Sequence, residues 1–298
     1  MAMKILAGKK YRKRIGDFVK HISGKNSTMK YGEYYEKEIL LPFGHERKRM
    51  LRVWLPPQYK TLKNKRFPVI YMADGQNLVD NELAAYGDWH LDKVIHDLEK
   101  KGFLAPVLVG LDCPKDPLER VLELNPPYEV DKKDFGVPAP EEVHPYGDRY
   151  INYFANVVKK EIDRTFRTNP SVKYTGIGGS SMGGIMAFYA FLKKPKVFGF
   201  SLAFSIPFFF YTDEHWIEIV NELGRKNNPK RKLAMFVGGI DSEKDFVPGA
   251  LAMVQYLRKI GYSENEFIFF RDPSMPHHED SWSKYCSGAF SFWLENLD

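Results

Sequence analysis

The sequence predicts an α/β fold, with one mainly parallel sheet of about eight strands and helices covering both of its faces. From residue 31 onward, short β-rich runs alternate with segments of helical periodicity. The middle runs are almost entirely apolar, as strands buried on both faces are. The chain has 298 residues, of which 44% are hydrophobic and 28% are charged, so it is long enough and apolar enough to bury a large core.

The expected strands are 35–41, 50–55, 68–72, 106–111, 172–178, 199–204, 233–237 and 266–270. Helices are expected between them, for example where Ile151, Phe154, Val158 and Ile162 recur at helical spacing. The sequence contains no repeat and no Gly/Ser-rich linker, so we expect residues 31–298 to form a single domain. Two long connections, 112–147 and 205–231, interrupt the alternation, and long loops in compact domains tend to be functional.

The excess positive charge lies at the N-terminus. Residues 1–30 carry a net charge of +8, whereas the whole chain carries +6, so the remaining residues are nearly neutral. We expect residues 1–30 to be a basic extension, either a solvated helix that covers the domain or an amphipathic helix that lies on anionic lipid through Ile15, Phe18, Val19 and Ile22. The body contains no nucleic-acid recognition motif, so no nucleic-acid partner is expected.

The sequence also indicates in which cellular compartment the protein is expected. Cys113 and Cys286 are too few for a disulfide framework and lack metal-ligand spacing, so both are expected to be packing residues. The N-terminus lacks the apolar core of a secretory signal, and no stretch approaches the ~18–20 apolar residues that a membrane helix needs. These features predict a cytoplasmic protein without a transmembrane segment.

A nucleophile motif follows the strand expected at 172–178. Residues 179–184 read Gly-Ser-Ser-Met-Gly-Gly, and only Ser181 has glycines both two positions before it and two positions after it. In the G-x-S-x-G turn between a strand and a helix, these glycines avoid collisions while the serine takes a strained conformation that projects its hydroxyl. The spacing therefore predicts Ser181 as a nucleophile.

A serine nucleophile needs a histidine base and a carboxylate that orients the histidine. In folds that place the serine in this strand–turn–helix motif, the chain order is serine, then aspartate or glutamate, then histidine. Asp241 is the first carboxylate after the strand expected at 233–237, and we expect it to orient the base, with Glu243 as its competitor. The loop after the last strand offers His277 and His278 as bases. The run from 277 to 280 lacks the spaced pairs of a metal site, so no metal is expected.

The oxyanion formed during acyl transfer needs two backbone N–H donors. One is expected from Met182, which follows the nucleophile, and the other from Gln76, in the glycine-containing turn after the strand expected at 68–72. The aromatic residues Phe208, Phe209 and Trp216 are expected either to form an apolar wall that binds substrate or to pack as a lid or core segment.

Over residues 32–298 the chain resembles the putative esterase family of α/β-hydrolases, which includes esterase D, enterochelin esterases, feruloyl and acetylxylan esterases and mycolyltransferases. The resemblance rests on residues 51–56, 68–77, 109–112, 176–187 and 195–199, together with Trp89, Leu91, Asp92, Arg120, Glu123 and Pro126. In that family a tryptophan typically stands five positions after the catalytic histidine, which matches Trp282 and assigns His277 as the base. The chain departs from the family at Ala73, where many relatives have histidine, and at 206–210, so the resemblance does not supply a substrate.

The resemblance and the motifs together imply a serine carboxylic ester hydrolase that acts on a small, aryl, sugar or siderophore-type ester through an acyl-enzyme, with neither a metal nor an organic cofactor. Two other functions stay open. An acyltransferase would use the same residues with an alcohol acceptor, and a non-catalytic member would only bind its ligand. The expected partner is a small-molecule ester, and the sequence leaves a homo-oligomer open.

Overall fold

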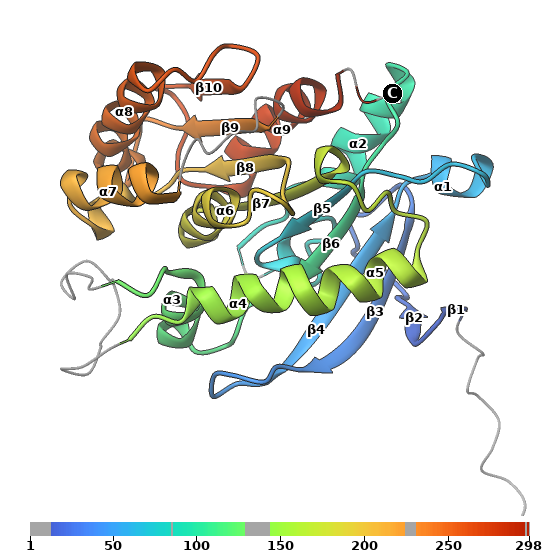
Figure 1. Cartoon of the computed structure of the whole chain (residues 1–298). Coiled ribbons are helices and arrows are strands. Elements are labelled where there is room, and N and C mark those ends of the chain that lie inside the picture. The colour runs from blue at the N-terminus through green and yellow to red at the C-terminus, as the bar shows by residue number, and fades with distance from the viewer. Residues whose placement is uncertain (1–12, 85, 129–143, 224–230, 296, 298) are drawn as a thin grey trace, which may run out of the picture.

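The computed structural model describes residues 13–84, 86–128, 144–223, 231–295 and 297, which form one mixed sheet with helices on both faces (Figure 1). The strand order in the described chain is β1-β2-β3-β4-β6-β5-β7-β8-β9-β10. The prediction of a mainly parallel α/β fold is confirmed, because β5 to β10 run parallel to one another.

The strands fall into two groups. The antiparallel group begins with two very short strands and continues into a long hairpin: β1 (Arg14–Ile15), β2 (Phe18–Lys20), β3 (Glu33–Leu40) and β4 (Lys48–Leu55). The parallel group is β5 (Val69–Met72), β6 (Val107–Leu111), β7 (Thr175–Ser180), β8 (Phe200–Phe204), β9 (Lys232–Val237) and β10 (Phe267–Arg271). β4 joins the groups by pairing antiparallel to β6. Parallel strands direct their carboxyl ends to one edge, where ligand sites of such sheets lie.

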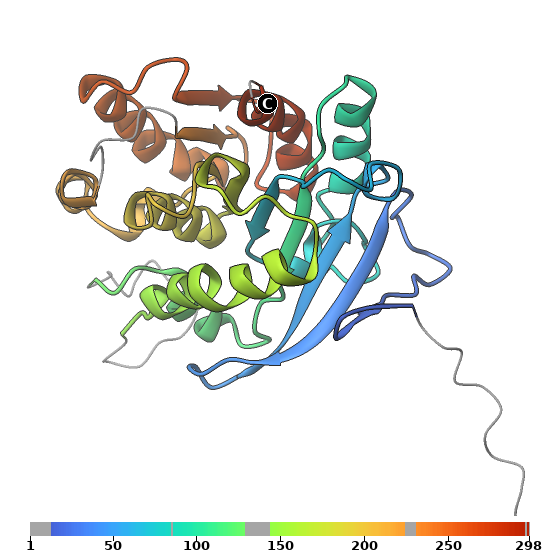
Figure 2. The same cartoon turned by 45° about the vertical axis from the view of Figure 1, so that its right-hand side comes forward.

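Side chains of the central strands alternate between two cores, because successive residues of a strand point to opposite faces. Val69 and Tyr71 of β5 point to one face and belong to the core under helices α4 to α8. Ile70 and Met72 point to the other face and belong to the core under α2 and α9. Figure 2 shows α4 and α5 lying across one face of the sheet. Both faces of the parallel strands are therefore covered, which accounts for their apolar sequences.

The helices have the following bounds: α1 (Gln58–Thr61), α2 (Leu91–Lys100), α3 (Pro117–Leu124), α4 (Gly147–Tyr153), α5 (Lys159–Thr165), α6 (Met182–Lys193), α7 (Asp213–Leu223), α8 (Glu243–Lys259) and α9 (Glu279–Leu294). A π-helical turn at Phe154–Val158 joins α4 to α5. Short 3-10 turns occur at η1 (Gly75–Asn77), η4 (Val172–Tyr174) and η5 (Phe208–Phe210). Each of the eight expected strands matches a strand of the structure to within three residues at either end.

The expectation of an N-terminal helix is wrong for the described residues of the basic segment, and residues 1–12 lie outside them. Residues 14–20 form β1 and β2, which pair with each other and with β3, so the sheet continues across the boundary expected at residue 30. Phe18 is fully buried in the core. Two lysines of the segment, Lys13 and Lys20, form ion pairs with Glu33 of β3 at 3.2 and 2.7 Å.

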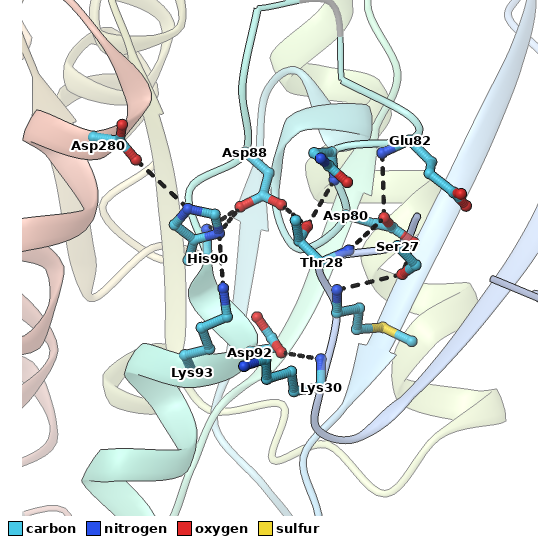
Figure 3. A network of polar contacts seen from close by, with 12 residues as sticks. Ser27, Thr28, Lys30, Asp80, Glu82, Asp88, His90, Asp92, Lys93 and Asp280 are labelled. Atoms are coloured by element: carbon cyan, nitrogen blue, oxygen red, sulfur yellow. Dashed lines mark hydrogen bonds and ion pairs between the residues drawn. The ribbon is translucent and has the colours of Figure 1, made fainter. Parts of the chain in front are cut away.

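The segment 24–31 continues along the domain and is held by carboxylates of the stretch before α2 (Figure 3). Asp80 accepts a hydrogen bond of 2.6 Å from the Ser27 hydroxyl, and Asp88 accepts one from the Thr28 hydroxyl. Backbone N–H groups are satisfied as well, since Lys30 N–H donates to Asp92 at 2.7 Å. Buried carboxylates that accept several such bonds fix the two segments against each other.

No helix within the described residues is both long and apolar enough to span a membrane.

Candidate active site

Ser181 lies at the sharp turn between β7 and α6, in a conformation that non-glycine residues rarely adopt. Its backbone angles are φ 56° and ψ −126°. The flanking glycines allow this turn, because a Cβ on Gly179 would lie 2.6 Å from the carbonyl carbon of Gly183. The Ser181 carbonyl accepts hydrogen bonds from Gly184 N–H and Ile185 N–H, so the serine is the N-cap residue of helix α6. The strain that the sequence predicts is therefore present at this serine.

His277 lies in the loop beyond β10 and pairs with Glu243, the first residue of α8. The His277 Nδ1 atom lies 2.7 Å from Glu243 Oε1, and the Glu243 side chain is completely buried. The other carboxylate oxygen, Oε2, accepts a hydrogen bond of 2.8 Å from Gly238 N–H. Because an ionised carboxylate only accepts hydrogen bonds, Nδ1 carries the imidazole hydrogen and Nε2 is left as the acceptor. This tautomer suits a base that takes a proton from a hydroxyl group.

The expected pairing of Asp241 with His277 is wrong, because the carboxylate that contacts this histidine is that of Glu243, the competitor considered from the sequence. Asp241 is exposed, with φ 53°, in the turn that leads into α8. Its carbonyl accepts a hydrogen bond from Lys244 N–H as the helix begins. Glu243 is the first residue of α8, and its longer side chain turns back beneath the end of β9 to reach Gly238.

The imidazole of His277 is held by aromatic rings on two sides. The Trp282 ring packs edge-on against it at a centroid distance of 5.0 Å, and the Phe246 ring lies 4.7 Å away. The Trp282 indole N–H donates to the Ser205 hydroxyl, which fixes the tryptophan. His278 serves a different purpose, since its Nδ1 accepts a hydrogen bond from Asp280 N–H and caps α9.

The two residues expected to supply oxyanion donors lie on the same cavity wall as Ser181. Gln76 belongs to the 3-10 turn after β5, and Met182 is the first residue of α6. Within the part of the chain that the structure describes, neither backbone N–H donates a hydrogen bond. Unpaired N–H groups at the start of a helix are free to bind a negatively charged oxygen.

A dense set of contacts fixes the turn that carries Gln76. The Arg120 guanidinium binds the Asp74 carboxylate in a bidentate manner, through two hydrogen bonds of 2.8 Å. Such bidentate pairs fix the geometry of both side chains. The Gln76 side chain accepts from Cys113 N–H at 3.0 Å and donates to the Cys113 sulfur at 3.1 Å. Burial, with the nearby Asp74 carboxylate, raises the pKa of the Cys113 thiol to about 12, so it stays protonated. Tyr34 donates a further bond to the Gly75 carbonyl.

These residues surround a cavity of about 870 Å³ at the carboxyl edge of the parallel strands. Its walls combine the elements described above with the stretch before α2 and the start of α9, including Leu83, Tyr86, Trp89 and Glu279. Ser181, Met182, Gln76 and His277 all line it. A volume of this size accommodates a small organic molecule.

The aromatic residues expected as a substrate wall or a packed segment, Phe208, Phe209 and Trp216, are not among the residues that line the cavity. Phe208 and Trp216 are 2% and 1% exposed and pack on each other, so they belong to the core, which is the second of the two alternatives expected for them. Phe209 is 41% exposed and packs on Phe246, which in turn contacts His277. The apolar residues that line the cavity include Leu83, Tyr86, Trp89 and Trp282.

Sequence reasoning did not single out several residues of the cavity. Glu279, Cys113 and Tyr86 line it although no motif marks them, because loops distant in sequence bring them together. Glu279 stands two residues after His277, and this proximity was the one signal available for it. Among the described residues, no group of three His, Cys, Asp or Glu side chains is arranged to hold a metal ion.

This sheet, with a strained serine between a parallel strand and the helix that follows it, defines an α/β-hydrolase fold. The chain belongs to the putative esterase family, since residues 44–243 match that family's model. A relative in Bacillus subtilis, the uncharacterized protein YbbA, is 22% identical over 256 residues, which cover 83% of this chain and 92% of the relative.

Solved structures share the fold at low sequence identity. An IroE-like serine hydrolase from Shewanella oneidensis is 18% identical, with a TM-score of 0.65 over 88% of this chain and 79% of that one. The siderophore hydrolase EstB from Aspergillus nidulans is 15% identical, with a TM-score of 0.66 over 93% and 97% of the two chains. Both likenesses concern the architecture.

Proposed function

We propose that this protein hydrolyses carboxylic esters through Ser181 as nucleophile, His277 as general base and acid, and Glu243 as the carboxylate that orients the histidine. The observation that carries the proposal is the 2.7 Å contact between His277 Nδ1 and the buried Glu243 carboxylate, beside a cavity that the strained Ser181 also lines. Membership of an esterase family supports an ester as the substrate.

In the proposed reaction, His277 Nε2 takes the proton of the Ser181 hydroxyl as its oxygen attacks the ester carbonyl carbon. The carbonyl π electrons move to oxygen, and the resulting oxyanion accepts hydrogen bonds from the N–H groups of Gln76 and Met182. When the tetrahedral intermediate collapses, the bond to the alcohol oxygen breaks and His277 gives its proton to that oxygen. Water then attacks the acyl-serine with the same assistance, which releases the acid and restores Ser181.

Two electrostatic features support this assignment. The Glu243 carboxylate is fully buried, so it stabilises the imidazolium of His277 in surroundings that screen the charges weakly. Helix α6 begins at Met182, and the positive end of its dipole stabilises negative charge that develops near Ser181. Both effects act on charges that are larger in the transition state than in the bound ester.

The proposal is tested by following hydrolysis of p-nitrophenyl acetate and butyrate by the whole chain and by Ser181→Ala. We expect the variant to lose about three orders of magnitude or more in kcat. A fluorophosphonate probe should add its mass to the peptide that contains Ser181. The matched control is Ser180→Ala, which keeps the Ser181 hydroxyl and must still be labelled there. Undiminished hydrolysis by Ser181→Ala overturns the proposal.

A further inference from the structure

The carboxylates that line the cavity differ in their partners. Arg120 forks Asp74, and Arg52 forks Asp112 with bonds of 2.6 and 2.8 Å, so arginines neutralise both of these carboxylates. Glu279 also lines the cavity, but it has no lysine or arginine partner within the described ranges. The cavity therefore holds one carboxyl group that no lysine or arginine of the described chain neutralises, with the imidazoles of His277 and His278 near it.

The Glu279 carboxylate is largely withdrawn from water. The residue is 6% exposed, and its Oε1 atom accepts a hydrogen bond of 3.3 Å from the Asn77 side-chain amide. Burial raises the pKa of Glu279, while its place in the first turn of α9 lets the helix dipole offset part of that cost. The residue's own backbone N–H is a second donor to it. A buried carboxylate without a cationic partner gains free energy when a cation arrives beside it.

Aromatic residues line the same cavity as this carboxylate. Trp89 and Trp282 line it, but they are only 2% and 5% exposed and pack on each other, and Trp89 stacks on Phe204, so little of their ring faces is open. Tyr86 lines the cavity as well and is 85% exposed. The stretch that carries Tyr86 and Trp89 closely approaches α9, because a Cβ on Gly87 would lie 3.7 Å from Glu279 Oε2. The faces of indole and phenol rings attract cations, most strongly where water is excluded.

The charges of the cavity are separated between two groups of elements. Its cationic side chains, Lys115 and Arg120, come from the β6–α3 connection and from α3, which packs on α4 and α6. Glu279 and the two tryptophans come from α9 and from the stretch before α2, and α2 packs on α9. A substrate that spans the cavity thus meets an aromatic and acidic wall at the end formed by α9.

We propose that Glu279 and Tyr86 form a subsite for an ammonium group carried by the alcohol part of the ester. This inference rests on the proposed function: His277 protonates the leaving alcohol, and Glu279 follows His277 by two residues on the same cavity wall. The substrate class is then an ester of an amino alcohol. The carboxylate supplies the opposite charge, and the exposed Tyr86 ring supplies a cation–π contact.

The kinetic test compares two esters of the same shape, acetylcholine and 3,3-dimethylbutyl acetate, which differ in the positive charge. We expect the intact chain to prefer the cationic ester by about tenfold in kcat/KM, and Glu279→Gln to reduce this ratio to about one. Asp280→Asn is the matched control, because it removes an adjacent carboxylate that is 71% exposed, and it should keep the ratio. Equal kcat/KM for both esters in the intact chain, or an unchanged ratio in Glu279→Gln, overturns the subsite.

A binding test does not depend on hydrolysis. Tetramethylammonium chloride is titrated against tryptophan fluorescence, with sodium chloride at the same ionic strength as reference. We expect saturable quenching in the intact chain and in Asp280→Asn, and at least about tenfold weaker binding in Glu279→Gln. If circular dichroism shows that Glu279→Gln is unfolded, Glu279→Asp replaces it, since it keeps the charge at the start of α9 but withdraws it from the cavity, and weaker binding is again expected.

The outcomes for the two proposals are separable. Hydrolysis of the neutral ester that depends on Ser181, together with no tetramethylammonium binding, contradicts the subsite alone. Saturable binding that depends on Glu279, with no hydrolysis of any ester and no fluorophosphonate labelling, contradicts the hydrolase alone.

Discussion

Exchanging the Glu243 carboxylate for an amide tests the proposed machinery most sharply. In Glu243→Gln the side chain keeps its size, so the change falls on hydrogen bonding. The backbone N–H of Gly238 donates to Oε2 at 2.8 Å and has no freedom to turn away. The glutamine must therefore present its oxygen to Gly238, which leaves its NH2 group facing His277 Nδ1.

This orientation dictates the size of the effect. With an amide donor opposite, Nδ1 must become the acceptor, and the imidazole hydrogen moves to Nε2. A histidine in that tautomer cannot accept the Ser181 proton, and loss of the correct tautomer costs about four orders of magnitude in kcat. Asp241→Asn is the matched control, because Asp241 is exposed and makes no contact with His277. We expect it to keep kcat within about twofold.

The assay measures kcat and KM of both variants on p-nitrophenyl butyrate, with circular dichroism and thermal unfolding to establish that each is folded. Imidazole ¹⁵N chemical shifts of His277 report the tautomer directly and should change only in Glu243→Gln. The reasoning is refuted if Asp241→Asn is the variant that loses orders of magnitude, or if Glu243→Gln is fully active with the tautomer exchanged.

Two further predictions concern the oxyanion turn and the N-terminal strands. In Gly75→Ala the new Cβ would lie 2.5 Å from the Gly110 carbonyl carbon, so the turn that carries Gln76 must shift; kcat should fall about a hundredfold with a smaller change in KM, and an unchanged kcat in the folded variant would contradict this. Burial opposes ionisation of Glu33, but hydrogen bonds from two lysines lower its pKa from 4.5 to about 2. Its ionised form therefore stabilises the fold above about pH 4.5, and this contribution is lost as the pH falls toward 2, so Glu33→Gln should lower the free energy of unfolding by about 2 kcal/mol at pH 7. In urea unfolding the difference should shrink on acidification, and a difference that grows would speak against it.

Much of the fold can be predicted from the sequence, because the parallel strands are buried on both faces and therefore appear as continuous apolar runs. The strands β1 and β2 cannot be predicted in this way, since they have only two and three residues and pair at the sheet edge. Their apolar residues, such as Phe18 and Val19, also fit helical spacing. What decides between the two structures is pairing with β3, a tertiary contact that local periodicity does not contain.

In the candidate site, too, the sequence locates some residues and not others. Steric demands of a sharp turn fall on adjacent residues, so the motif alone located Ser181. The choice between Asp241 and Glu243 depended on where α8 begins, because the first helical residue is the one directed back toward His277. Helix boundaries are set by capping and packing and are the least predictable feature of a sequence. The place of Glu279 depends on three distant segments and has no local signature.

The attachment of segment 24–31 to the stretch before α2 has an evolutionary consequence. Asp80, Asp88 and Asp92 accept hydrogen bonds from that segment, and the stretch that they belong to also carries Trp89 into the cavity wall. A substitution on one side leaves a buried acceptor or donor unpaired unless the other side changes with it. Among relatives, residues 24–31 should therefore co-vary with residues 80–92, so that the basic N-terminus diverges together with the wall of the cavity and not as an independent tail.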